Sequence, residues 1–517
     1  MAVRRQVESN CKLADPLFSF PQTFLLLAQV SIKLAMSVAL RTIYLSAIVC
    51  LGMSGILSHR LYFIRGEHHL KASQYLATWI LAMVLASTFL HINNFSILPS
   101  VSIINCAFLG PLFSSIVVYR IFQHPLRVFK GPTLASVSKL WHFVYMFKTS
   151  NHLFLNELVE RYGQIVRTGP QELTIVDPDI WTAIGSRNGS CIKAPWYDML
   201  WPYVSLNSIR GKDGYRARRK LWDDALRLST AYLPENDSCI NRLASLLVDQ
   251  IQTCIGQPVD VKILCFNFSF DVMGELAFGR TFSLLRDPKT AAQSDSHDAP
   301  TLISQGMSML RFFTPVPWVG HLCFAFAPYL PIITPKWNRA LKWAAEMCDE
   351  RLERGINHEH HADAFSRFIL AANIEDDRKS LDRLALYGDA FAIIVAGSHS
   401  TAATLTMLCF ELAQHPEAQQ QARTEVLAAR YRQETNSDSD ELTQERYPFL
   451  DACINETLRL YPVVPTGGVR QTVTEGINVG GSWIPPNTVI VAPRWTLGRR
   501  RAPYYLRINS QSVNAST

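Results

Sequence analysis

The chain has 517 residues, of which 48% are apolar, and a formal net charge of +7. This length allows one large core or several ordinary domains. The basic excess is mild and forms no dense Lys/Arg block, so we expect no nucleic-acid partner, whereas a membrane surface would suit it. The cysteines number 11, are scattered and form no C-x-x-C pair, which disfavours a disulfide framework or a zinc site.

Long uncharged apolar runs fill the first quarter of the chain. Each approaches the roughly 20 residues that cross a bilayer as a helix. Buried core helices are the alternative, but three such runs close together favour a membrane. Residues 23–40 are also apolar but contain Lys33, so their status stays open. We therefore predict a multi-span membrane anchor over residues 1–118, with spans in 42–57, 75–90 and 97–118.

Basic residues orient these spans. They lie in the loop between the first two runs and again after the last run: Arg60, Arg65, Lys71, Arg120, Arg127 and Lys130. Loops rich in Lys and Arg stay on the cytoplasmic side of a membrane. We therefore expect everything after residue 120 to lie in the cytosol.

The remainder of the chain predicts an α+β domain in which helices dominate. Prolines interrupt helix at both ends of a short basic link in 119–135. Alternation of apolar and polar residues predicts strands in 162–181 and 478–492, and polar composition predicts loops in 283–303 and 432–446. Helical spacing covers 215–228, 337–356, 381–414 and 416–430. In the first of these helices arginines lie in the opening turn, where they oppose the helix dipole.

The apolar helix in 389–418 has a polar centre. Buried polar groups are costly unless they are hydrogen-bonded, and a glycine with back-bonding hydroxyls lets a helix bend. Two interpretations stay open here: a satisfied polar kink used in packing, and a helix opened to receive a small ligand. The centre consists of Gly397, Ser398, His399, Ser400 and Thr401.

Three further stretches carry charged residues. In residues 449–465, Glu456 and Arg459 share one helix face, and their apolar neighbours suggest that the pair is buried. In TGGVRQT (466–472) the glycines allow a close backbone approach, with Arg470 beside it. Tyr215 and Arg219 lie one helical turn apart, and Arg219 and Arg470 could clamp one anion.

Together these stretches resemble the cytochrome P450 family, especially its membrane-bound fungal members of secondary metabolism. The resemblance runs over roughly residues 119–499 in family order, through YRIFQHPLRVFKGP, AGSHSTA, LAQHPE, NETLRLYP and VVPTGGVRQT. It implies the cytochrome P450 fold, mainly α with small β-sheets, over residues 119–498, preceded by transmembrane helices.

The resemblance also implies roles for individual residues. Arg219 and Arg470 would face the propionates of the haem (heme) cofactor with Tyr215 beside them, and Glu456 and Arg459 would form the core pair that braces the haem-side scaffold. Ser400 and Thr401 would hydrogen-bond dioxygen and relay protons. His399, which stands where the family usually has an acid, can still shuttle protons near neutral pH.

The activity implied is hydroxylation or a related oxidation of an apolar natural product. NADPH–cytochrome P450 reductase would supply the electrons, and the chain would be a multi-pass protein of the endoplasmic reticulum membrane with its globular domain in the cytosol. The substrate itself cannot be read from these residues.

Two departures from the family pattern affect these expectations. Ser400 replaces the usual threonine next to His399, and the cysteine loop whose thiolate binds haem iron is not found, since the last cysteine is Cys453. We therefore expect a domain truncated before that loop, an atypical tail at residues 499–517, no axial metal ligand and no catalysis by the chain as written. Whether it binds haem stays open. The alternative is a non-enzymatic membrane-bound pseudoenzyme or scaffold.

Overall fold

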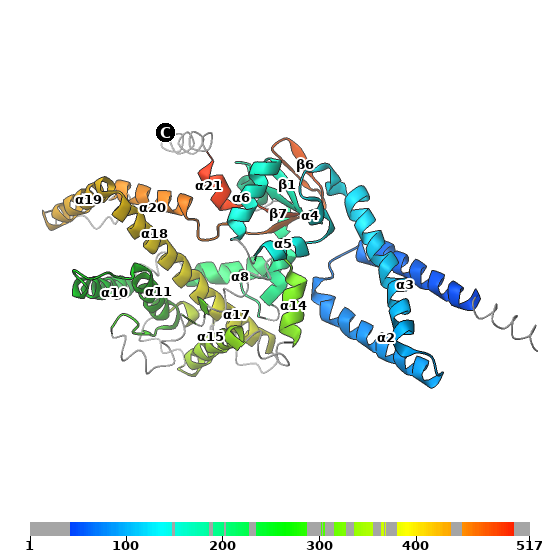
Figure 1. Ribbon diagram of the computed structural model, residues 1–517. Helices are drawn as coiled ribbons and strands as arrows, with labels where there is room; N and C mark the ends of the chain where they lie inside the picture. The colour runs from blue at the N-terminus through cyan, green and yellow to red at the C-terminus, as the bar shows by residue number, and fades with distance from the viewer. Residues whose placement is uncertain are drawn as a thin grey trace, which may run out of the picture. The chain divides into compact units, whose positions relative to one another are not determined.

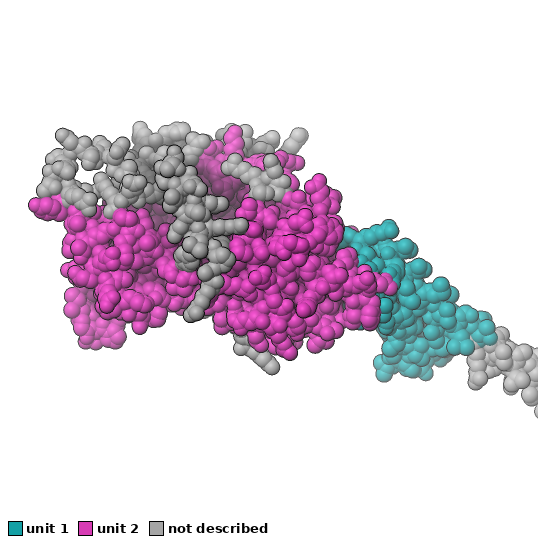
Figure 2. Space-filling view, turned by 90° about the horizontal axis from the view of Figure 1, so that it is seen from above, with its two compact units in different colours: residues 1–66, 76–119 teal, residues 67–75, 120–517 magenta. Residues whose placement is uncertain are grey.

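The computed structural model describes residues 42–146, 150–185, 190–200, 203–226, 234–286, 301, 303–304, 315–326, 335–354, 363–366, 368, 380–435 and 447–500. The chain divides into two compact units, one of residues 1–66 and 76–119 and one of residues 67–75 and 120–517. Figure 2 shows the two units in separate colours.

The smaller unit is built from three apolar helices. The first candidate span is Thr42–Phe63, which ends in the π-helical turn η1 (Ser58–Phe63), and the others are His69–Ile92 and Ile97–Gln123. They contain α2 (Ala72–Ile92) and α3 (Ile97–Val118). All three are long and apolar enough to cross a membrane, as the sequence predicted. Apolar side chains cover their outer surface; Leu98, for example, is 80% exposed. Residues 23–40 lie outside the described residues.

Small residues let two of these helices approach closely. A Cβ atom on Gly55 would collide with the Phe108 carbonyl oxygen of α3, and one on Gly52 would lie 3.4 Å from Pro111. Close backbone approach at glycines is a common way for helices to pack within a membrane. The contact ends in a hydrogen bond of 2.8 Å between His59 Nδ1 and Ser115 Oγ.

The larger unit is mostly helical with small sheets, as the sequence predicted (Figure 1). Its short turns are η2 (His69–Lys71), η3 (Tyr119–Gln123), η4 (Pro125–Val128) and η5 (Pro195–Leu200). Its shorter helices are α4 (Thr133–Val137), α5 (Leu140–Met146), α6 (Asn151–Tyr162), α7 (Ile180–Gly185), α8 (Lys212–Ala225), α14 (Pro317–Phe326) and α21 (Arg494–Arg499). The longer ones are α10 (Pro234–Thr253), α11 (Val261–Phe278), α15 (Pro335–Glu353), α17 (Ser380–Ile394), α18 (Ser400–Gln414), α19 (Pro416–Thr435) and α20 (Pro448–Leu460).

A fourth helix, Arg383–Gln414, also has the length and composition of a membrane span. It consists of α17, the π-helical turn η7 (Val395–His399) and α18. Because α17 packs on α15 and α18 packs on α11 within the larger unit, we assign it to the globular domain.

The main sheet has five strands in the order β1-β2-β7-β4-β3. The hairpin of β1 (Ile165–Gly169) and β2 (Glu172–Ile175) is antiparallel, and β7 (Val489–Val491) runs parallel to β2. Next come β4 (Arg470–Thr472) and β3 (Cys191–Lys193), paired so that Lys193 lies opposite Arg470. A separate pair consists of β5 (Ile477–Val479) and β6 (Ser482–Ile484). Strands therefore occur in both regions where alternation predicted them.

The larger unit has a helical core and a core beside the sheet. The first gathers side chains of α11, α15 and α17, among them the fully buried Phe270 and Phe278. The second gathers Leu173, Ile175 and Ile490 around the strands. A further buried cluster joins α6 to the strands through Leu155 and Val166. Full burial of one such side chain contributes about 1.5–3 kcal/mol, so these cores stabilise the helices and strands of the larger unit.

Helix α8 differs from its sequence-based prediction. It begins at Lys212, and Asp213 lies in its first turn. The arginines that were expected at the helix start therefore belong to later turns, where their conflict with the helix dipole is weak. The predicted loops at 283–303 and 432–446 fall largely outside the described residues.

Candidate functional site

The long helix of α17 and α18 is interrupted by η7, as its polar centre predicted. A Cβ atom on Gly397 would collide with Met273 Sδ, so η7 lies tightly against α11. Just after it, Ser400 Oγ donates to the Ala396 carbonyl oxygen, and Thr401 Oγ1 donates to that of Gly397 at 2.8 Å. These back-bonds satisfy both hydroxyls within the helix, and π-helical turns of this kind are frequent at functional sites.

His399 faces α11. Its ring centre lies 4.7 Å from that of Phe266 and 6.3 Å from that of Phe270. Within the part of the chain that the structure describes, neither ring nitrogen has a hydrogen-bond partner. Burial lowers the pKa of His399 below its ordinary value, so the imidazole is neutral at pH 7. Consecutive helical residues point about 100° apart, so His399 and Thr401 face different sides.

Two neighbouring arginines of α8 point in different directions. Arg218 Nε donates to Asp389 Oδ2 at 2.6 Å, and that aspartate of α17 has an exposed fraction of 0%. Arg219 has a side chain that is 53% exposed and donates to Asp223 Oδ1 at 2.7 Å. Hydrogen bonds to Tyr215 and Asp223, one turn away on either side, raise the pKa of Arg219.

A group of cations and tyrosines, hereafter the cation cluster, lies where β3, β4, η5 and α8 meet. It consists of Lys193, Tyr197, Tyr215 and Arg470. Arg470 Nη1 lies 3.2 Å from the Tyr197 hydroxyl, and Lys193 Nζ lies 4.5 Å from the centre of the Tyr215 ring. Burial, together with the charge of Arg470, lowers the pKa of Lys193 to about 8.

Two glycines make this arrangement possible. Gly467 has a φ of +73°, and a Cβ atom there would collide with the Ala492 carbonyl oxygen. A Cβ atom on Gly468 would lie 3.0 Å from the Tyr197 hydroxyl and 3.3 Å from Arg470 Nη1. The close backbone approach predicted for TGGVRQT therefore occurs at both glycines. At Gly468 it is an approach to the cation cluster.

Helix α8 connects two parts of the predicted site. Tyr215 reaches the cation cluster with Arg470, and Arg218, one turn later, holds α17. Tyr215 and Asp223, the partners of Arg219 among the described residues, lie on α8 itself, so the structure does not join Arg219 to Arg470. Sequence reasoning missed Lys193 and Tyr197. Lys193 belongs to a strand of 3 residues, too short for an alternation pattern, and the pairing that brings it to Arg470 is between distant segments.

The structure brings Glu456 and Arg459 together on α20. Arg459 Nε donates to Glu456 Oε2 at 2.7 Å, and Arg459 Nη1 donates to the Gly498 carbonyl oxygen. The expected burial of the pair was wrong for the described residues, since the glutamate side chain is 48% exposed. The physical reason is that the contacts of α20 are with α18, α19 and α21, which leave the face that carries Glu456 open.

The thiols of two described cysteines have opposite pKa shifts. Cys191 on β3 is two residues from the cation cluster, but burial raises the pKa of its thiol to about 11, so it stays protonated. A hydrogen bond from Cys265 lowers the pKa of Cys409 to about 7, but Cys409 lies on α18, the same helix as Ser400. The cation cluster, in contrast, has the donors that carboxylates require.

Comparison with known proteins identifies the family. The family model for cytochrome P450 matches residues 131–505. Cytochrome P450 monooxygenase FCK2 of Fusarium pseudograminearum is 34% identical over 458 residues, which cover 86% of this chain and 79% of the relative. Tryprostatin B 6-hydroxylase of Aspergillus fumigatus is 31% identical over 88% of this chain and 79% of its own length.

A third relative, cytochrome P450 monooxygenase orf5 of Eupenicillium brefeldianum, is 34% identical and is matched over 75% of either chain. All three relatives are fungal oxygenases by name. The family match covers most of the globular domain, including α8, the interrupted helix and the strand that carries Arg470. The chain therefore belongs to the cytochrome P450 family.

Proposed function

We propose that the chain is a membrane-anchored oxygenase of fungal secondary metabolism, whose ancestral reaction is the hydroxylation or related oxidation of a small apolar natural product. Relatives named as monooxygenases and as a hydroxylase of tryprostatin B support this. NADPH–cytochrome P450 reductase is the electron donor that the family implies. A small apolar substrate is likewise what the family implies.

The observation that carries the proposal is the pair of cations at the cation cluster. Lys193 and Arg470 lie opposite each other on adjacent strands, and no ion pair joins either to a carboxylate among the described residues. Like charges side by side are unfavourable, and an anion between them relieves the repulsion. Haem presents two propionates, which Arg and Lys bind by charge-assisted hydrogen bonds.

In this proposal Arg470 and Lys193 hold a haem carboxylate, and the hydroxyls of Tyr197 and Tyr215 complete its surroundings. Arg219, whose side chain is 53% exposed on α8, would be the candidate to hold the second carboxylate. The Arg459–Glu456 pair fixes the end of α20 to Gly498. When bound, haem supplies the iron centre at which dioxygen is activated.

The residues of the interrupted helix hold and move protons. The hydroxyls of Ser400 and Thr401 donate to helix carbonyls and keep their oxygen lone pairs available to accept a proton. Burial lowers the pKa of His399, so its ring is neutral at pH 7 and its unprotonated nitrogen can accept a proton only when a donor lies close to it. Because its ring faces Phe266, transfer between His399 and the two hydroxyls needs a rotation or a water molecule.

The anchor and its location belong to the same proposal. In this proposal residues 1–118 form a multi-pass anchor in the endoplasmic reticulum membrane and residues 119–498 form the oxygenase domain in the cytosol, while residues 501–517 lie outside the described residues. The three apolar helices and the basic loops support this topology. Protease added to intact microsomes should degrade the region after residue 120, and its protection would contradict the orientation.

Porphyrin binding tests the cation cluster. Full-length chain in detergent micelles is titrated with metal-free protoporphyrin, which has two carboxylates, and with its dimethyl ester, which has none. We expect the dicarboxylate to bind at least about tenfold more tightly, as one charge-assisted contact allows. Arg470→Met and Lys193→Met should remove that preference, while Lys342→Met, at an exposed lysine that pairs with Glu346, should not. Equal binding of both porphyrins would refute the assignment.

A non-enzymatic scaffold is the second candidate. It is supported by two cysteines, since burial keeps the thiol of Cys191 protonated and Cys409 lies on the same helix as Ser400. That the 517 residues as printed do not catalyse oxygenation stays a prediction. A cooperative melt of purified chain without any haem absorbance would favour the scaffold.

A further inference from the structure

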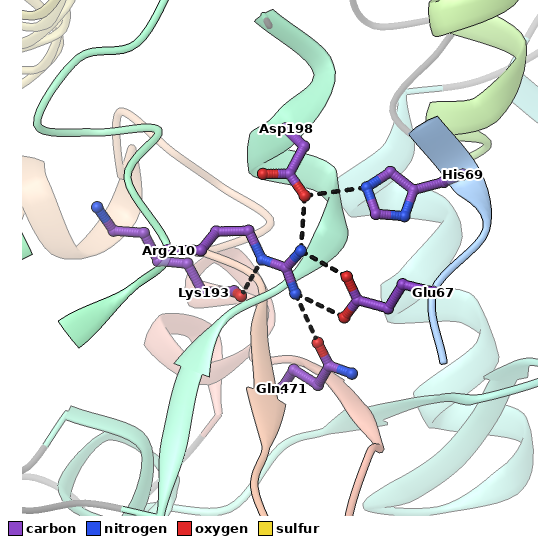
Figure 3. A network of polar contacts seen from close by, with 6 residues as sticks. All are labelled: Glu67, His69, Lys193, Asp198, Arg210 and Gln471. Atoms are coloured by element: carbon purple, nitrogen blue, oxygen red, sulfur yellow. Dashed lines mark hydrogen bonds and ion pairs between the residues drawn. The ribbon is translucent and has the colours of Figure 1, made fainter. Parts of the chain in front are cut away.

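A second polar network lies beside the cation cluster and is not part of it. Figure 3 shows Arg210 at its centre, with carboxylates on two sides. Arg210 Nη1 and Nη2 donate to the two oxygens of Glu67 at 2.6 and 2.7 Å, and Nη1 also donates to Asp198 Oδ2 at 2.6 Å. His69 Nε2 lies 2.9 Å from the same Asp198 oxygen. We call this network the loop clamp.

The charged groups of the loop clamp form hydrogen bonds and ion pairs with one another. The side chain of Arg210 is 15% exposed, and Nη2 and Nε also donate to Gln471 Oε1 at 3.0 Å and to the Lys193 carbonyl oxygen at 2.8 Å. Burial opposes ionisation of Glu67 and Asp198. It is outweighed at Glu67 mainly by Arg210 and at Asp198 by the hydrogen bond with His69 together with Arg210, so the pKa of each carboxyl is lowered. Two-pronged contacts of this kind fix geometry as well as charge.

Its members come from three distant parts of the chain. Glu67 and His69 belong to the short segment between η1 and α2, Asp198 lies on η5 with Arg210 shortly after it, and Gln471 lies on β4. Glu67 to Tyr75 belong to the larger unit even though the helices on either side of this segment belong to the smaller one. The clamp therefore fastens an inter-span loop to the edge of the main sheet.

The loop clamp and the cation cluster are built from the same short backbone segments of β3, η5 and β4. The Lys193 carbonyl accepts from Arg210 while its ammonium group joins the cluster. Asp198 follows Tyr197 directly on η5, and Gln471 follows Arg470 directly on β4. Neighbouring residues of a strand point to opposite faces, so Gln471 can bond Arg210 on one side while Arg470 bonds Tyr197 on the other.

We infer that Glu67 and Arg210 are positioning residues: the loop between the first two apolar helices sets the geometry of the cation cluster through the shared backbone of Lys193, η5 and β4. The identity of the cluster's ligand rests on the proposed function, but the coupling between loop and cluster does not. The segment at residues 67–75 can in this way influence the part of the larger unit that carries the cation cluster.

A metal site is the competing interpretation of the same residues. Ligand atoms of Glu67, His69 and Asp198 all lie within 4.8 Å of one another. However, the guanidinium group of Arg210 already bonds both glutamate oxygens and one aspartate oxygen. A cation would have to displace this permanently charged group, so the geometry favours the clamp.

The test follows the reactivity of the Lys193 amine, which does not require haem. Full-length chain in micelles is acylated over a range of pH, and labelling of each lysine is measured by mass spectrometry. The midpoint for Lys193 should lie near pH 8 in the unchanged chain, following its pKa. In Glu67→Gln and Arg210→Lys, the backbone of β3, η5 and β4 should be held less firmly. Water should then reach Lys193 and move the midpoint upward by about one pH unit or more.

Controls separate positioning from general stability. Glu346→Gln removes the same charge from an exposed pair and should leave the Lys193 midpoint unchanged, and Lys342 labelling serves as an internal reference. Arg210→Lys keeps the charge but loses the two guanidinium nitrogens that bond Glu67. A folded variant with a shifted Lys193 midpoint therefore supports positioning. A lower melting temperature with an unmoved Lys193 midpoint would overturn the inference and leave only a structural tether. Failure of porphyrin to bind would affect the proposed function alone.

Discussion

Two arginine–carboxylate pairs of this protein differ in almost every respect. Arg218 and Asp389 join α8 to α17, and the aspartate is fully buried, whereas Arg459 and Glu456 lie on one turn of α20 with the glutamate 48% exposed. The sequence motif drew attention to the second pair and gave no sign of the first. A motif therefore identifies which residues meet, but burial decides how much their meeting contributes to stability.

The physical difference is solvation. A buried charge that loses its partner keeps its full desolvation cost, while an exposed charge is returned to water. Asp389 also accepts a hydrogen bond from the Leu206 backbone at 3.2 Å, so the buried pair connects three segments. The exposed pair connects α20 to the Gly498 carbonyl oxygen. We expect five variants to rank accordingly.

The largest effect should come from Arg218→Ala. It leaves Asp389 buried without a cation, which costs about 3–5 kcal/mol of the free energy of unfolding. Denaturant unfolding of the full chain in micelles measures the loss. The double variant Arg218→Met with Asp389→Leu should recover most of it because it removes both charges. A loss below about 1 kcal/mol for the single variant would contradict the comparison.

Gly388→Ala should come next, because it tests the packing around the buried pair. A Cβ atom there would lie 2.5 Å from the Val204 carbonyl oxygen, a backbone atom that can move only if the chain around it shifts. Overpacking of this kind costs about 1–3 kcal/mol. Gly214→Ala on α8 is the control, since its nearest neighbour is 3.5 Å away and alanine favours helix. A destabilised control would show that both effects arise elsewhere.

Lys193→Met should change how stability depends on pH. Its pKa is about 8 in the folded chain against an ordinary 10.5, so the unfolded chain binds more protons between these values. Stability therefore rises with pH across this window, on the order of 1–2 kcal/mol after allowance for solvent screening. The methionine variant should lack this rise when unfolding is measured from pH 7 to 11. Parallel curves for the two proteins would rule out the depressed pKa.

The smallest effect should come from Glu456→Ala and Arg219→Ala. Both remove one partner of an exposed pair, Arg459 in the first case and Asp223 in the second. Such pairs contribute about 0–1 kcal/mol, and added salt should reduce the difference further. A loss comparable to that of Arg218→Ala would mean that burial is not what separates the two kinds of pair.

Much of the fold could be predicted from local patterns. Three apolar runs became helices, and alternation in 162–181 and 478–492 became strands. The close backbone approach in TGGVRQT was correctly expected, because a glycine marks a position where the backbone leaves no room for a side chain. The start of α8 was missed, since Lys212 and Asp213 lie before the first apolar repeat.

The candidate site was only partly predictable. Arg470 and Tyr215 were named in advance, but Lys193 joins them through strand pairing between distant segments, which leaves no local pattern. The loop clamp was missed for the same reason, because Glu67 and Arg210 are separated by 143 positions. The burial of Glu456 was wrongly expected because its apolar neighbours were taken to define the core, whereas Leu458 is itself 39% exposed.

Haem reconstitution tests the central claim most directly. The 517-residue chain is incubated with haemin in micelles, reduced and exposed to carbon monoxide, beside its Arg470→Met variant. We predict a haem absorbance band that weakens in the variant, without the shift typical of thiolate ligation, because burial keeps the thiol of Cys191, two residues from the cation cluster, protonated. A thiolate-type absorbance, or a haem band of equal strength in both proteins, would contradict this account.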